Sequence, residues 1–260
     1  MLFRSAIGSS DSHDVSRFIV GQGRTYVACR DDDPGALDVT EACRNLRAGR
    51  ALVSLGLLTQ IRVNDRFSSG DLATNLTEEI RVEITVLGPS WTSADRVELF
   101  ANGNKIREQN VPLTTAVEKA KIVWTIPRPG HDVHLVAIAS GLGVRAPFWE
   151  IPRPYQPSSP LFTPRVLGST GVVWLDADGD GKFTPARAYA KALLTRFGTS
   201  APRLVPALGD YDRAVAAQAA GLCHAAGVDV RTPVFAVALK IAPPAVGEGF
   251  LAFVESLRGR

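Results

Sequence analysis

The chain has few of the residues that build covalent or metal frameworks. It contains only three cysteines, Cys29, Cys43 and Cys223, and no Cys-x-x-Cys spacing. Neither a disulfide framework nor a zinc ribbon is therefore expected, and isolated buried thiols are the simplest interpretation.

Long runs of a single character are also missing. No stretch of Lys and Arg reaches five residues, although the net charge is +3 and the pI is about 8.9. We therefore expect no nucleic-acid partner. No apolar run reaches the roughly 18 residues of a membrane span, and the residues before the motif "GSSDSH" at 8–13 do not have the pattern expected of a signal peptide.

What the chain does contain is ordinary globular material. Its 260 residues are 45% hydrophobic and 21% charged, which is enough apolar content for a sizeable core. The length suits one large domain or two smaller ones.

The first segment, 1–56, is expected to hold two strands and a helix. The second strand would span 24–28. The acidic loop "DDDPG" at 31–35 precedes apolar residues with helical spacing over 37–46, and Gly49 is a candidate to end that helix.

The second segment, 57–151, changes to a period of two. Apolar residues alternate with polar ones over 80–86 and 97–101, and strands are also expected over 105–109, 120–126 and 133–139. Asn102-Gly103 between two of them is a strong hairpin signal. Such spacing predicts an immunoglobulin-like or fibronectin-like antiparallel β-sandwich, with an open antiparallel sheet as the alternative.

The remainder divides into a linker and a mainly helical region. Residues 152–165 hold five prolines and are expected to form an extended linker. In 166–260 we predict a strand over 171–175 and helices over 185–197, 211–226 and 250–257.

Asp11 and His13 form the first candidate metal-ligand pair. A carboxylate and a neutral imidazole suit zinc, manganese or iron, but a catalytic site needs at least three protein ligands. The other histidines are His131, His134 and His224. His131 and His134 are expected on opposite faces of a strand, so surface or core roles are favoured for all three.

The run "AIGSSDSHDVSRFIVGQGRTYV" at 6–27 resembles the closing segment of the PHP (polymerase and histidinol phosphatase) metallohydrolase domain, in the branch that includes carbaryl hydrolases. The match continues through "GRALVSLG" at 49–56. It implies that Asp11 and His13 bind a divalent transition metal (zinc, manganese or iron) in a complete parent.

The resemblance also implies that most of the family's barrel and metal ligands are missing from this chain. The family fold is a distorted β/α barrel with further ligands, and the matched region is only its end. The chain would then be the C-terminal portion of a hydrolase, lacking its N-terminal barrel. In the parent, metal-activated water would cleave a phosphoester, ester or carbamate bond of a small molecule. The isolated chain is expected to be inactive.

A second candidate site is the acidic stretch "DADGDGKF" at 176–183. Asp176, Asp178 and Asp180 occupy alternate positions before a glycine, as in the first half of a calcium loop, and the carbonyl of Lys182 would be a further ligand. Arg187 stands where such a loop normally has a bidentate Glu. The alternative is a solvated acidic turn held by its own side-chain hydrogen bonds. A calcium role would be structural and favours a secreted or periplasmic parent.

Two functions from different classes therefore remain open. One is the severed metal-dependent hydrolase. The other is a non-catalytic β-sandwich module, binding or structural, with a calcium-stabilised helical tail.

Overall fold

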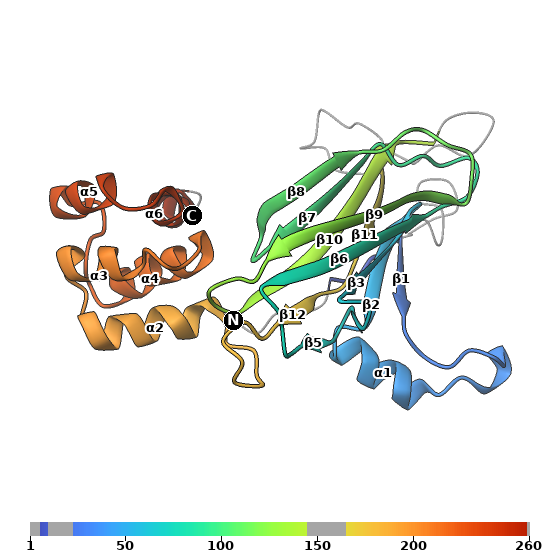
Figure 1. Cartoon of the computed structure of the whole chain (residues 1–260), viewed down its shortest axis with the longest axis horizontal. Helices are drawn as coiled ribbons and strands as arrows, with labels where there is room; N and C mark the ends of the chain where they lie inside the picture. The colour runs from blue at the N-terminus through green and yellow to red at the C-terminus, as the bar shows by residue number, and fades with distance from the viewer. Residues whose placement is uncertain (1–5, 10–22, 145–164, 259–260) are drawn as a thin grey trace.

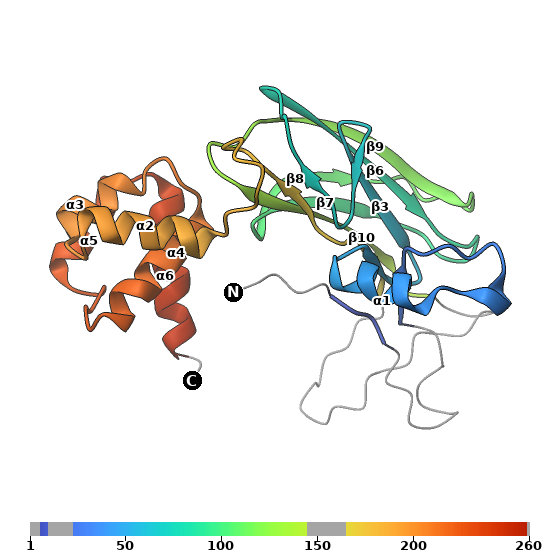
Figure 2. The same cartoon turned by 90° about the horizontal axis from the view of Figure 1, so that it is seen from below.

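The computed structural model describes residues 6–9, 23–144 and 165–258. Within them the protein is mixed α/β, with mainly antiparallel sheets and six α-helices, and no sheet closes into a barrel. The helices α2–α6 lie at one end of the β layers, and α1 lies apart from them beside β1 and β2 (Figures 1 and 2).

The strands and helices have the following bounds. The strands are β1 Arg24–Val27, β2 Ala51–Leu55, β3 Leu58–Val63, β4 Phe67–Ser68, β5 Leu72–Ala73, β6 Glu79–Leu87, β7 Arg96–Ala101, β8 Asn104–Asn110, β9 Glu118–Pro127, β10 Val133–Leu142, β11 Arg165–Ser169 and β12 Val173–Leu175. The α-helices are α1 Val39–Arg47, α2 Ala186–Phe197, α3 Ala201–Ala207, α4 Arg213–Ala225, α5 Pro233–Lys240 and α6 Pro244–Arg258.

Two sheets share one apolar core. In the described residues, the larger sheet runs in the order β1-β2-β11-β10-β12-β5, with β7 on β10 and β8 on β7. The smaller sheet runs β4-β3-β6-β9. Side chains of both meet in one cluster, such as Ile84 of β6 and Leu99 and Leu135 of the larger sheet, all fully buried. The alternating pattern places these residues on one face of each strand, and this burial drives the two sheets together.

The predicted hairpin is confirmed. Asn102 and Gly103 join β7 to β8, with φ angles of 48° and 82°. Both positions therefore need a left-handed backbone, which Asn and Gly tolerate best. The strands predicted over 80–86, 97–101, 105–109, 120–126 and 133–139 are confirmed as β6 to β10.

The larger sheet draws strands from three of the expected segments. β1 and β2 come from 1–56. β5, β7, β8 and β10 come from 57–151, and β12 and all of β11 except its first residue come from 166–260. The predicted strand over 171–175 is the shorter β12, and β11 was not expected. The expected linker, 152–165, lies outside the described residues except for Arg165, where β11 begins.

The predicted helix near 37–46 is α1. The side chain of Asp38 caps it by accepting a hydrogen bond from the N–H of Glu41 at 2.9 Å. Asn45 fixes it to the residue that follows β1 through a 2.7 Å hydrogen bond from its amide to the carbonyl of Ala28. Gly49 follows the helix with a φ of 77°, as expected for a C-terminal glycine.

The last helices form a bundle with its own core, which includes fully buried Leu204, Val215 and Val246. The helices predicted over 185–197 and 211–226 are confirmed as α2 and α4. α6 begins earlier than the predicted 250–257, and α3 and α5 were not predicted. α4 packs closely on α6 at Gly249, where an added Cβ would lie 2.6 Å from the Cβ of Ala216.

Candidate metal site at the junction of sheets and helices

The acidic stretch predicted from the sequence lies where the sheets meet the helical bundle. It connects β12 to α2, and the loop between β9 and β10 lies against it. The two loops are 45 positions apart in the chain at the Asp132–Ala177 hydrogen bond. Their contact brings carboxylates from distant parts of the sequence together.

The acidic loop has a tight, internally bonded shape. The two oxygens of Asp176 accept hydrogen bonds from the N–H groups of Gly179 at 2.9 Å and Gly181 at 3.0 Å. Both glycines have a φ of 80°, a conformation that other residues rarely adopt. Asp176 is itself buried, so the loop wraps around a carboxylate withdrawn from solvent.

Asp132, from the β9–β10 loop, completes a group of three carboxylates. One ligand oxygen from each of Asp132, Asp176 and Asp178 lies within 4.8 Å of the others. Asp132 is fully buried and also locks the two loops together. Its oxygens accept hydrogen bonds from the N–H groups of Ala177 at 2.7 Å and Thr184 at 2.7 Å.

Among the described residues, these three carboxylates accept hydrogen bonds from backbone N–H groups and the Tyr189 hydroxyl, and they form no ion pair. Burial raises the pKa of Asp132 and the neighbouring Asp178 adds to the rise, while the backbone hydrogen bonds to Asp132 oppose it. The nearby Arg128 donates to the carbonyl oxygens of Ala177 and Leu76. Its hydrogen bonds therefore hold the backbone and do not pair with the carboxylates.

Tyr189 connects the acidic group to the helical bundle. Its hydroxyl donates to Asp178 at 2.9 Å and accepts from the N–H of Asp132 at 3.2 Å. Burial, together with the acidic neighbours, raises the pKa of Tyr189, so the phenol keeps the proton that it donates. The ring belongs to α2 and packs against Tyr211, with ring centroids 5.6 Å apart.

A second group of polar contacts, around Asp212, connects the sheets to the helical bundle. Asp212 caps α4 by accepting from the N–H of Val215 at 2.9 Å, and it also accepts from the amide of Asn102 at 2.8 Å. The Nε2 atom of His131 lies 3.3 Å from Asp212, close enough for an ion pair but without good hydrogen-bond alignment. The hairpin turn between β7 and β8 is thereby tied to the start of α4.

The sequence-predicted ligands fall into separate places. Asp176 and Asp178 belong to the group of three, whereas the side chain of Asp180 accepts from the N–H of Lys182 at 2.8 Å on the exposed rim. Arg187 lies on α2 and contacts Gln218 at 3.5 Å. Asp11 and His13 lie outside the described residues.

Sequence reasoning missed Asp132 and the role of His131. Asp132 stands alone between His131 and Val133, with no ligand spacing around it. Its place directly before the strand predicted over 133–139 was the only signal in the sequence. His134, half-buried, and His224, on α4, are not part of the carboxylate group in the described residues.

Comparison with known proteins adds no relative. No family model, no curated protein and no solved structure matches the chain. In the described part of the chain, no helix has both the length and the apolar character needed to cross a membrane.

Proposed function

We propose that the protein is a non-catalytic binding or structural module, in which a bound calcium ion fixes an immunoglobulin-like β-sandwich to a helical bundle. The observation that carries the proposal is the convergence of Asp132 with Asp176 and Asp178. Two mainly antiparallel sheets around one core support the sandwich part.

Calcium is the cation that this chemistry favours. All three side chains offer carboxylate oxygens, and hard cations take oxygen ligands. The loop begins as a calcium loop does, and the carbonyl of Lys182 remains a candidate ligand. Asp132 supplies a carboxylate that the loop itself lacks, because Arg187 stands where the usual Glu would be. A cation here would also favour the ionised form of Asp132.

A cation at this position would act on the junction between the two parts. Asp132 belongs to the sheet side, Asp176 and Asp178 to the connecting loop, and Tyr189 carries the contact onto α2. Holding the three carboxylates together would keep these segments in a fixed position relative to one another. The role is therefore structural, and we assign no reaction to it.

The hydrolase expectation rests on Asp11 and His13, which the structure does not describe. A PHP-type parent using zinc, manganese or iron stays a prediction. The two readings are compatible if the module is the C-terminal part of such a parent.

Thermal unfolding with and without calcium tests the proposal. At a calcium concentration about 100 times the dissociation constant, binding to the folded state alone stabilises it by about 2.7 kcal/mol. We expect the midpoint to rise in calcium for the wild type. Asp132→Asn should lose most of this rise, although Asp132 is outside the loop motif.

The control is Asp229→Asn, which changes an exposed aspartate paired with Arg231 at 2.8 Å. It should keep the full calcium response. Comparing calcium-induced shifts, and not midpoints, removes any direct cost of the substitutions. An unshifted wild type, or an Asp132→Asn variant with the wild-type shift, would contradict the calcium-stabilised junction.

A further inference from the structure

A cavity of about 610 Å³ lies between the β1–β2 ribbon and the outer face of β3 and β6. Tyr26 and Leu52 face it from the ribbon, and Gln60, Arg62 and Glu83 face it from the smaller sheet. A volume in this range suits a small molecule. None of these residues belongs to the candidate metal site.

The floor of the cavity is a compact polar patch. In the backbone register of β3 and β6, Gln60 lies opposite Thr85, and Arg62 lies opposite Glu83. Because side chains two residues apart share a strand face, these four lie side by side on the outer surface. Together they offer hydrogen-bond donors and acceptors, which suits a ligand with several hydroxyl groups.

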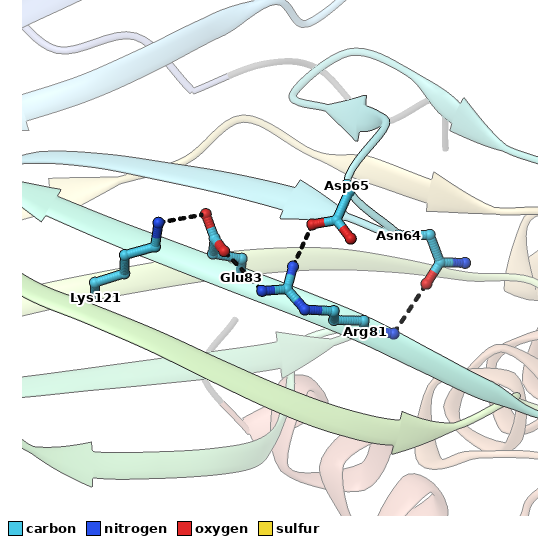
Figure 3. A network of polar contacts seen from close by, with 5 residues as sticks. All are labelled: Asn64, Asp65, Arg81, Glu83 and Lys121. Atoms are coloured by element: carbon cyan, nitrogen blue, oxygen red, sulfur yellow. Dashed lines mark hydrogen bonds and ion pairs between the residues drawn. The ribbon is translucent and has the colours of Figure 1, made fainter.

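The negative charge of the floor is already compensated. Figure 3 shows Glu83 between Arg81, at 2.8 Å, and Lys121, at 3.4 Å. The hydrogen bond from Arg81 lowers the pKa of Glu83, against the effect of burial, with Lys121 adding to it. Arg81 also contacts Asp65, and its N–H donates to Asn64 at 2.9 Å. This network fixes Glu83 as an ionised, oriented acceptor.

The two arginines that line the cavity differ in whether an acidic residue pairs with them. Arg50, which also lines the cavity, pairs with Asp71 at 3.1 Å. Arg62, in contrast, makes no ion pair with any residue in 6–9, 23–144 or 165–258. The cavity therefore has one arginine available for a ligand anion, and a guanidinium binds a carboxylate through two parallel hydrogen bonds.

The opposite wall is apolar and carries an aromatic ring. It is formed by Val27, Ala28 and Leu52, with the half-exposed Tyr26 beside them, while Leu58 adds an apolar side chain at the β3 side. An apolar wall facing a hydroxyl-matching floor suits a ring with one apolar face and polar edges.

We propose that this cavity binds a sugar acid of one or two rings. Its carboxylate is taken by Arg62, its hydroxyls by Gln60, Glu83 and Thr85, and its apolar face by the Tyr26 wall. The site gives the module a ligand class that does not depend on calcium.

Titration of the isotopically labelled full chain with D-glucuronate, followed by NMR, tests this proposal. D-glucose and acetate serve as probes that lack the carboxylate or the hydroxylated ring. We expect glucuronate to bind with a dissociation constant below about 10 mM and to shift the amides of β3 and β6. Both single-feature probes should bind at least about tenfold more weakly.

Arg62→Gln should weaken glucuronate binding by about tenfold or more. Arg66→Gln is the matched control, because Arg66 is in the same hairpin but lies over the Phe67 ring, 4.9 Å from its centroid. It should bind as the wild type does. No saturation by glucuronate at about 10 mM, equal binding of either single-feature probe, or equal effects of the two arginine variants would overturn the proposal.

Discussion

Replacing Asp212 should reveal how strongly the helical bundle is held to the sheets. This carboxylate does two things at once. It caps α4 through the N–H of Val215, and it accepts the amide of Asn102 from the β7–β8 turn. His131, 93% buried at its side chain, lies 3.3 Å away. One substitution therefore affects both the helix and the junction.

The expected cost follows from these contacts. Loss of an aspartate cap costs about 1 kcal/mol. A hydrogen bond from the Asn102 amide to a charged acceptor contributes about 1.5 kcal/mol. Asp212→Ala should therefore lower the free energy of unfolding by about 2–3 kcal/mol. Asp212→Asn keeps a capping oxygen, so its cost should be about 1–2 kcal/mol.

Urea unfolding followed by circular dichroism measures both variants, with helical signal reporting the bundle. The order wild type, Asp212→Asn, Asp212→Ala is the signature of a cap plus a junction contact. An Asp212→Ala variant within about 0.5 kcal/mol of the wild type would show that the described contacts carry no net stability. Equal costs for the two variants would remove the cap from the explanation.

Two further outcomes are expected. Burial opposes ionisation of Asp212, but the contacts from His131, Val215 and Asn102 outweigh it and lower the pKa of Asp212. Its ionised form therefore stabilises the fold at neutral pH, and the stability gap between wild type and Asp212→Asn, measured by urea unfolding, should shrink as pH falls below about 4. In α6, Gly249→Ala should cost about 1–3 kcal/mol, because its Cβ would lie 2.6 Å from that of Ala216 on α4. Gly247→Ala, with open space around the new Cβ, should stabilise the fold by about 0.5–1 kcal/mol. Thermal unfolding should therefore show a lower midpoint for Gly249→Ala and a higher one for Gly247→Ala than for the wild type. A lower midpoint for Gly247→Ala would contradict this reasoning.

The strands of the middle segment could be predicted because their information is local. Period-two alternation and the Asn102-Gly103 turn suffice to place β6 to β10. α3 and α5 were missed because they are short, with 7 and 8 residues, and begin near prolines that suggest loops. The start of α6 was missed since Gly247 and Gly249 dilute its pattern, and the second glycine is there for contact with α4.

Only part of the candidate metal site could be predicted from the sequence, because only that part stands in a local motif. Asp176 and Asp178 stand in a short motif, so residue spacing alone predicts that their carboxylates bind the same cation. Asp132 joins them only through the folding of a distant loop, which no local pattern encodes. The cavity at Arg62 is likewise formed by strands of both sheets, whose relative placement depends on how the two sheets pack.

The late position of β11 and β12 has a consequence for how the chain folds during synthesis. Both strands pair with β10, so the larger sheet stays incomplete until Leu175 has left the ribosome. Until then the growing chain exposes one edge of β10 to other chains, an opening for mispairing. The helical bundle, built from contacts between neighbouring helices, can form soon after its residues emerge. The slow step should therefore belong to the β layers, although they are made first.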